Sequence, residues 1–257
     1  MSTILVTGGT GTLGRVLVTT LAGAGHKVRV LSRRPRPPSA DPHAWATGDL
    51  RRSQGIAEAL AGADVIIHCA TAARGDDVAA ANLIAAAHRS GALHLVYISI
   101  VGIDQVPLGY YRTKLNTERL IRESGLPWTI QRTTQFHDLI LRACTALARL
   151  PVMLVPAGTS FQSLHVAEVA ERLGGLAAAP AAGRVPDIAG PQVRTTAELA
   201  RSYLRAAGKR RGVLPVWLPG AAAAGFRRGG HLAPGNAAGR VTFEELLERR
   251  LRAGGSR

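Results

Sequence analysis

The 257-residue sequence predicts an α/β fold, with helices covering both faces of a mainly parallel sheet. Short β-branched runs alternate with helical segments over the first 132 residues, beginning with a strand at Thr3–Thr7. A glycine-rich turn joins that strand to a helix at Leu13–Ala24, and a second strand follows at Lys27–Ser32. This order is typical of a doubly wound, Rossmann-type sheet, which binds ligands beyond the carboxyl ends of its strands.

The alternation of strands and helices continues to about residue 132 and is less regular after it. We expect strands at Asp64–Cys69, Leu93–Ser99 and Trp128–Arg132, and helices at Ile56–Leu60, Asp77–Ser90 and Tyr110–Ser124. Later helices are expected at Asp138–Leu150, Val166–Ala179, Thr195–Ala207 and Thr242–Arg252. Between the last two, Pro215, Pro219, Gly220 and Gly225 break up an apolar stretch, where we expect no regular element. We therefore divide the chain into a dinucleotide-binding core (1–132) and remaining sheet elements with a small C-terminal, substrate-covering lobe (133–257), and we expect the two to form one continuous domain.

Composition narrows the classes of function. The net charge is +15, but the arginines are scattered along the whole chain, so we do not expect nucleic acid as a partner. No run of about 18 apolar residues occurs, so no membrane span is expected. We expect no signal peptide and a cytoplasmic location, since a strand starts at Thr3. The two cysteines are unpatterned, and no clustered ligands indicate a metal site.

The first turn predicts a dinucleotide site. Its glycines, Gly8, Gly11 and Gly14, follow a strand and open a helix, which is the context that such a motif requires. Glycine lets backbone N–H groups approach a pyrophosphate, and the helix N-terminus adds a positive dipole end. The neighbours Thr10, Thr12 and Leu13 are expected to contact the cofactor as well.

The end of the second strand favours NADP over NAD. An NAD site usually places an acidic residue there to bind the ribose 2′-hydroxyl. Here Ser32, Arg33 and Arg34 occupy that position, and the next acid is Asp41. Arginine pairs with a 2′-phosphate that a carboxylate would repel. The alternative is a pair of solvated surface arginines.

Two further strand ends are expected to touch the nucleotide. Asp49 is placed to bind the adenine amino group and Leu50 to pack on its ring, although an ordinary turn aspartate explains the spacing nearly as well. Small residues end the strand at Asp64–Cys69, where the backbone can pass close to the nicotinamide ribose: Ala70, Thr71 and Ala72.

A candidate catalytic set comes from the next strand and helix. Ser99 ends a strand, and Tyr110 and Lys114 follow on one helix face at i and i+4. A nearby ammonium would lower the pKa of Tyr110, which would protonate a carbonyl oxygen that Ser99 orients. Tyr111 offers a competing hydroxyl, and a packed tyrosine beside a surface lysine is the alternative.

Several segments resemble the NmrA-like, NAD(P)H-binding branch of the atypical short-chain dehydrogenase/reductase superfamily. They are TGGTGTLG at the start, LVYISIVGID at 95–104, YYRTKLNTERLIRESGLPWTIQRTTQFHD at 110–138, FQSLHVAEVAERL at 161–173 and VTFEELL near the end. The resemblance spans nearly the whole chain but is poorly specific for reaction. It implies cofactor contacts at Gly8, Gly11, Gly14, Arg33, Asp49, Lys114 and 133–136, which include Thr133 and Gln135. It also implies a catalytic role for Ser99, Tyr110 and Lys114.

Residues after the strand at Trp128–Arg132 are expected to line the substrate pocket. They are Gln135, Phe136 and His137, with His137 as an optional acid or base and more often structural. Met153 and Trp217 are expected to be apolar loop residues that pack normally, with a place beside the substrate as the alternative.

These observations predict an NADPH-dependent oxidoreductase that acts on a small organic carbonyl, enone or quinone as a monomer or homodimer. Two alternatives stay open. One is a non-catalytic NAD(P)H-binding sensor or assembly factor. The other is a sugar-nucleotide epimerase, for which the second half of the chain is short.

Overall fold

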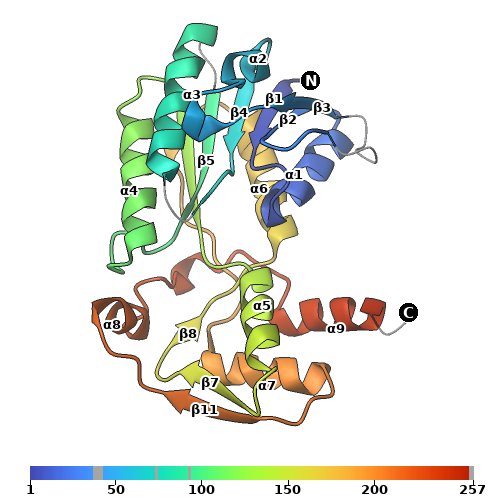
Figure 1. The fold of residues 1–257 in the computed structure, drawn as a ribbon, viewed down its shortest axis with the longest axis vertical. Helices are drawn as coiled ribbons and strands as arrows, with labels where there is room; N and C mark the ends of the chain where they lie inside the picture. Colours follow the sequence, from blue (N-terminus) through green and yellow to red (C-terminus); the bar gives the residue numbers. More distant parts are fainter. Residues whose placement is uncertain (37–42, 73–74, 92–93, 255–257) are drawn as a thin grey trace. The chain divides into compact units, whose positions relative to one another are not determined.

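The computed structural model describes residues 1–36, 43–72, 75–91 and 94–254 (Figure 1), without the side chains after 250. The chain packs into two units. Unit 1 contains Met1–Ser99, Gly109–Arg132 and Ala167–Pro186; unit 2 contains Ile100–Leu108, Thr133–Val166 and Asp187–Arg257. The boundary at residue 132, which the sequence suggested, is one of the points where the chain passes from unit 1 to unit 2.

Unit 1 is built on a seven-stranded sheet in the order β3-β2-β1-β4-β5-β6-β9. Every pairing whose register is described is parallel, for example Thr7 with His68 between β1 and β4. The predicted doubly wound α/β fold is therefore confirmed. The strands are β1 (Thr3–Thr7), β2 (Lys27–Ser32), β3 (Ala44–Thr47), β4 (Val65–His68), β5 (His94–Ile100), β6 (Trp128–Thr133) and β9 (Gly183–Arg184).

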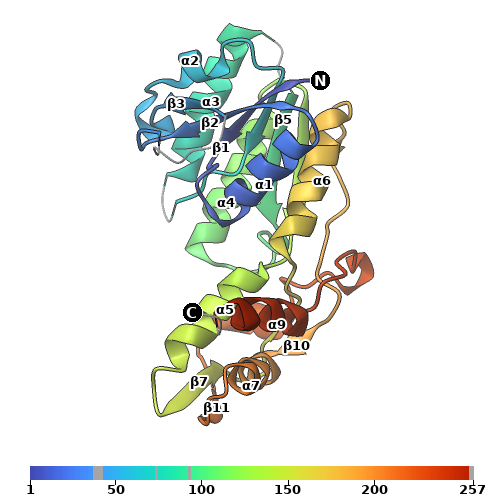
Figure 2. The same ribbon diagram turned by 90° about the vertical axis from the view of Figure 1, so that its right-hand side faces the viewer.

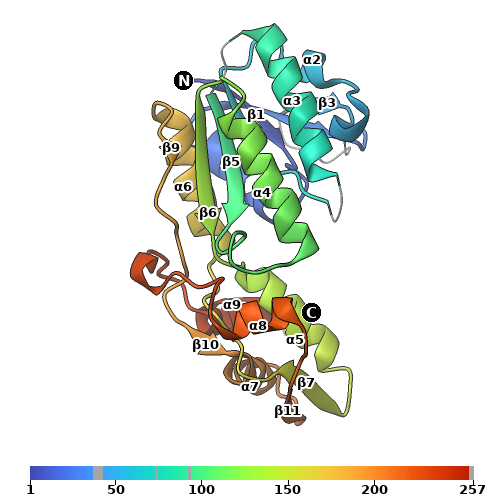
Figure 3. The same cartoon turned by 90° about the vertical axis from the view of Figure 1, so that its left-hand side faces the viewer.

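Helices cover both faces of this sheet. Figure 2 shows α1 and α6 on one face, where Gly174 of α6 approaches Leu21 of α1. Figure 3 shows α3 and α4 on the other face, which α2 also covers. The helices are α1 (Thr12–Gly23), the 3-10 helix η1 (Leu50–Arg52), α2 (Ile56–Leu60), α3 (Asp76–Ser90), α4 (Gly109–Arg122) and α6 (Val166–Ala178).

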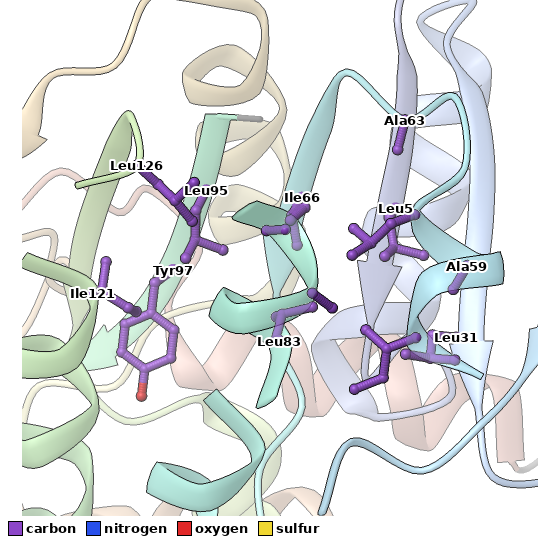
Figure 4. Close-up of a cluster of buried hydrophobic side chains, with 14 of the residues drawn as sticks. Leu5, Leu31, Ala59, Ala63, Ile66, Leu83, Leu95, Tyr97, Ile121 and Leu126 are labelled. Atoms are coloured by element: carbon purple, nitrogen blue, oxygen red, sulfur yellow. The ribbon is translucent and has the colours of Figure 1, made fainter. Parts of the chain in front are cut away.

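The strands are buried on both sides because alternate residues enter different layers. Leu5, Ile66 and Leu95 pack with Leu83 and Ile121 beneath α2, α3 and α4 (Figure 4). Their neighbours in sequence, such as Ile4, Val6 and Ile67, are equally buried. Tyr97 ends this layer, and its ring carries a hydroxyl beyond the aliphatic core (Figure 4).

Unit 2 contains shorter elements and two two-stranded sheets. β8 pairs antiparallel with β10, whereas β7 pairs parallel with β11. A Thr195–Glu198 capping box starts α7. The elements are α5 (His137–Leu147), β7 (Val152–Pro156), β8 (Ser160–Phe161), β10 (Arg194–Thr195), α7 (Thr196–Ala206), β11 (Gly212–Val216), α8 (Ala221–Arg227), the 3-10 helix η2 (Pro234–Asn236) and α9 (Phe243–Gly254).

The predicted helices all form, with bounds that differ by a few residues. The expectation of an irregular segment around Pro215 is wrong, because β11 runs through this proline and α8 follows it. Proline lacks an N–H donor, but β11 has β7 as its only described partner, and such an edge strand tolerates the missing donor. The very short strands β8, β9 and β10 carry too few residues to show a periodicity in sequence.

Candidate functional site

The glycine turn between β1 and α1 is as tight as the motif predicts. Gly8 has a φ of +72°, and a Cβ there would lie 2.6 Å from the backbone nitrogen of Ala70. A Cβ at Gly14 would collide with the carbonyl oxygen of Gly8, so the turn and α1 need a residue without a side chain at both positions. The turn therefore packs directly on the end of β4.

The N-terminus of α1 is suited to an anion. Gly11 is the N-cap and provides no side-chain cap, and no acidic residue occupies the first turn. The amides of this turn are therefore open to a ligand, with the positive end of the helix dipole behind them. Thr10 and Gly11 are exposed and Thr12 is half-buried, whereas Leu13 is buried in the core.

Two exposed arginines directly follow the end of β2. Ser32 is buried, and its hydroxyl accepts a hydrogen bond from the backbone N–H of Arg34 at 3.1 Å. The carbonyl of Arg34 accepts one from the Trp45 ring at 3.0 Å. Arg33 and Arg34 are exposed, and no described carboxylate pairs with them. Asp41, the next acid in sequence, lies outside the described residues.

Asp49 has a structural role in the turn after β3. Its carboxylate accepts a hydrogen bond from the Arg51 backbone N–H at 2.9 Å and caps η1. Asn82 of α3 donates to the carbonyl of Leu50 at 2.7 Å, which ties this turn to α3. Asp49 thus has the role of an ordinary turn aspartate. The contacts of Asp49 and Leu50 with adenine stay predictions.

A chain of polar groups, here called the Asp76 network, connects the end of β4 to α3 and α4. Thr71 donates its hydroxyl hydrogen to the Asp76 carboxylate at 2.7 Å. Because that hydrogen is committed, the Tyr110 hydroxyl donates to Thr71, at 2.8 Å. The backbone N–H of Ala72 donates to Asp76 at 2.6 Å, and the Lys114 ammonium lies 3.5 Å from the same carboxylate. Thr71, Asp76, Tyr110 and Lys114 therefore form one continuous hydrogen-bonded and ionic path.

Lys114 is buried between aromatic rings. Its ammonium lies 5.0 Å from the Tyr97 ring centre and 5.9 Å from that of Tyr110. Burial lowers the pKa of Lys114, and the Asp76 carboxylate opposes that shift. His68 stacks on Tyr97, and its Nδ1 lies 2.7 Å from the Thr7 hydroxyl. Burial, with a smaller contribution from Lys114, lowers the pKa of His68 to about 3, so this ring is neutral near pH 7.

The expected electrostatic pairing of Tyr110 and Lys114 is wrong in one respect. The pKa of Tyr110 is raised, first by burial and further by Asp76, although the Thr71 hydrogen bond opposes the shift. The Lys114 charge is directed to Asp76 instead. At neutral pH Tyr110 therefore keeps its proton and can act as an acid. Tyr111, the competing tyrosine, is buried and lies outside the Asp76 network.

Ser99 is deeply buried near the end of β5, and its hydroxyl has no hydrogen-bond partner among the described residues. A buried hydroxyl without a partner is costly, which is consistent with a ligand that supplies one.

The four predicted residues at and just after the end of β6 belong to unit 2. The backbone of Thr133 bonds to Val101, and that of Gln135 bonds to Leu164. Phe136 is the half-buried N-cap of α5. His137 is buried, with Nδ1 2.7 Å from the Ser163 hydroxyl and Nε2 2.9 Å from the Val241 carbonyl. Both ring nitrogens are thus used inside unit 2, which favours the structural interpretation of His137.

Sequence reasoning missed Asp76, which joins the other members of its network. The available signal was the Asp-Asp pair that starts an alanine-rich helix, because acidic residues there are normally assigned to the helix dipole. Only the fold shows that Asp76 also reaches Lys114 on α4. Among the described residues, no cluster of three or more potential metal ligands occurs. No described helix is both long enough and apolar enough to cross a bilayer.

Residues 8–170 match the model of the NAD(P)H-binding family, so the chain belongs to that family. This confirms the NAD(P)H-binding branch to which the sequence segments pointed. In the solved structures, NADPH-dependent quinone oxidoreductase QOR2 from Escherichia coli superposes with a TM-score of 0.83. It is 20% identical, and the match covers 96% of this chain and 99% of that one. At that identity the likeness establishes the fold alone.

Curated relatives include proteins of different function. The Photosystem II assembly factor Ycf39 of Trieres chinensis is 28% identical over 65% of this chain and 57% of its own length. The NAD(P)H azoreductase of Xenophilus azovorans is 28% identical over 80% of this chain and 74% of its own. This chain thus spans little more than half of the assembly factor. Family membership establishes an NAD(P)H-binding protein and leaves the reaction open.

Proposed function

We propose that this protein is an NADPH-dependent reductase that transfers hydride to a small organic carbonyl, enone or quinone. The Asp76 network is the observation that supports this function. It presents a protonated Tyr110 hydroxyl at the carboxyl end of β4, where the glycine turn packs on Ala70. Reduction of a carbonyl needs such a proton donor beside the nucleotide.

The residues of unit 1 fit a nicotinamide dinucleotide. The glycine turn and the uncapped α1 form a cradle that a Cβ would fill, and the buried Ser99 hydroxyl lacks a partner. We assign the pyrophosphate to this cradle and the 2′-phosphate to Arg33 and Arg34. When bound, the reduced nicotinamide supplies hydride to the acceptor carbon.

The chain's own groups then handle the proton. Tyr110 donates its hydroxyl proton to the acceptor oxygen, which Ser99 orients. Thr71 returns a proton to the Tyr110 oxygen and recovers one through Asp76 from the Lys114 ammonium. Burial lowers the pKa of Lys114, so this ammonium gives up its proton more easily than a free lysine would. Water restores it after the product leaves.

Replacing Tyr110 tests this function. In steady-state oxidation of NADPH with a panel of quinones, enones, ketones and aldehydes, Tyr110→Phe should lower kcat about 10²- to 10⁴-fold. Its NADPH dissociation constant should stay close to that of the wild type. Tyr111→Phe, which removes a hydroxyl outside the Asp76 network, is the matched control and should retain turnover. Unchanged turnover in Tyr110→Phe would refute the proton-donor assignment.

A second function is favoured by the similarity to the assembly factor Ycf39. In that case the protein binds NADP(H) without using it and acts by binding another protein. It would bind NADPH tightly but oxidise none with any member of the panel. The same measurements therefore separate the two functions.

A further inference from the structure

The sheet formed by β7 and β11 in unit 2 has one apolar face that no described segment covers. Leu154 pairs with Leu214 across the two strands, and Val152 lies over Gly212. Leu150 precedes β7, and Trp217 and Leu218 follow β11. The exposed fractions of these six side chains, the apolar patch, are Leu150 47%, Val152 40%, Leu154 46%, Leu214 52%, Trp217 68% and Leu218 42%.

The opposite face of the same sheet is ordinary core. Met153 and Val155 are buried and pack with residues of α5, α7 and α9. The solvent face of a sheet normally carries polar side chains, so leucine, valine and tryptophan there are unusual. Met153 thus packs normally, as predicted, but it lies in strand β7 and not in a loop. The expectation of normal packing for Trp217 is wrong.

The apolar patch is bordered by cations. Lys209, Arg210 and Arg211 are exposed immediately before β11, and Arg149 is exposed immediately before Leu150. No described carboxylate pairs with these four groups. The sequence from 199 to 243 contains eight lysines and arginines but no acidic residue, and 139–167 contains two arginines and no acid. The two chain segments that carry the apolar patch are therefore rich in cations and contain no acid.

Trp217 is held in its exposed position from within unit 2. The Arg227 guanidinium lies 3.7 Å from the Trp217 ring centre, and it donates a hydrogen bond to the Leu218 carbonyl at 2.7 Å. One residue thus fixes the ring and the backbone that follows it. The ring is presented to solvent at little further cost in conformational entropy.

The charge and the apolar side chains together indicate what kind of partner binds the apolar patch. A second copy of this chain, joined about a two-fold axis, would bring two cationic borders together without any acid to neutralise them. A nucleic acid would supply phosphates but no apolar phase for the leucines and the tryptophan. An anionic lipid surface supplies both, because lysine and arginine bind its headgroups while tryptophan and leucine enter its interface.

We propose that the apolar patch and its cationic border dock this protein on an anionic membrane surface. The docking uses residues outside the Asp76 network and does not depend on the proposed reductase activity.

Vesicle sedimentation of the full chain tests the proposal, with phosphatidylcholine vesicles that contain or lack phosphatidylserine. We expect binding to the anionic vesicles that weakens as salt screens the charges. Replacing Lys209, Arg210 and Arg211 by glutamine should weaken it about 100-fold, or about fivefold per cation. Trp217→Ala should weaken it about tenfold through the lost apolar area.

Matched variants keep the outcome interpretable. Replacing the exposed Arg89, Arg119 and Arg122 of unit 1 by glutamine removes the same charge and should leave vesicle binding near the wild-type level. Leu214→Ser, at a leucine 52% exposed in the apolar patch, should also weaken vesicle binding, whereas its control Leu139→Ser, at a leucine 48% exposed on α5, should not. Equal binding to neutral vesicles, or equal loss in both triple variants, would overturn the proposal. So would a wild-type dimer that Trp217→Ala dissociates, or nucleic-acid binding that needs the cations but not Trp217.

Discussion

Helix α4 carries two buried ion pairs, and they differ in how the carboxylate is used. In its C-terminal half, Glu118 binds Arg132 of β6 through two contacts of 2.8 Å, so each carboxylate oxygen faces the same guanidinium. In its N-terminal half, the ammonium of Lys114 lies 3.5 Å from Asp76, whose carboxylate is shared with Thr71 and Ala72.

The two ion pairs differ in whether their charges can take part in a reaction. A bidentate arginine pair fixes geometry and leaves little for a ligand to change. A shared carboxylate beside a buried lysine links several groups that gain or lose protons together. We therefore assign the Glu118–Arg132 pair to joining α4 and β6, and the Lys114–Asp76 pair to the proposed reaction.

Removing the Glu118 charge should have the largest effect on stability. In Glu118→Gln, Arg132 stays buried without its counter-charge, and the free energy of unfolding should fall by about 3–5 kcal/mol. Urea denaturation followed by circular dichroism measures this. Glu123→Gln, at an exposed glutamate just beyond α4, is the control and should change stability little. A loss below about 1 kcal/mol in Glu118→Gln would contradict the structural assignment.

Lowering the pH should destabilise the folded protein through His68, which stacks on the same Tyr97 ring that Lys114 faces. Its pKa in the folded protein is about 3, below the ordinary 6.5, so between these values the unfolded chain binds more protons. This contribution is complete above pH 6.5 and is lost as the pH falls, by about 3 kcal/mol at pH 4.

The effect is measured as the difference in pH dependence of unfolding between the wild type and His68→Asn. The asparagine variant should lose less stability between pH 7 and pH 4. Parallel curves for the two proteins would show that His68 does not titrate in this way.

The smallest effect expected is on cofactor choice, at the exposed end of β2. Replacing Arg33 and Arg34 by serine removes the proposed partners of a 2′-phosphate. Affinity for NADPH should fall about 10- to 100-fold, while affinity for NADH changes little. Fluorescence titration with both nucleotides measures this. A wild-type preference for NADH would refute the assignment of NADP.

Much of unit 1 could be predicted because its signals are local. Strands β1 and β2 have the predicted bounds. Gly14 is required by contacts within the turn itself, and Gly8 has a positive φ there, although the backbone that a Cβ at Gly8 would meet belongs to distant Cys69 and Ala70. Tyr110 and Lys114 share a helix face because of their spacing alone. Unit 2 was harder to predict. Pro215 argues against a strand in the sequence, and β11 forms there only through its pairing with β7.

By itself, the sequence indicated the parallel α/β fold, the glycine cradle, the cations after β2 and the Tyr110–Lys114 spacing, because the signal for each lies in residues close together in the chain. Tertiary structure alone decided which carboxylate Lys114 faces, that His137 is used internally and that Trp217 is exposed. These depend on side chains brought together from distant segments: Asp76 is 38 positions from Lys114, and Val241 is 104 from His137. Burial and pairing between such distant residues set the pKa values of buried groups and the exposure of side chains. The hydrophobic periodicity of the sequence does not contain this information.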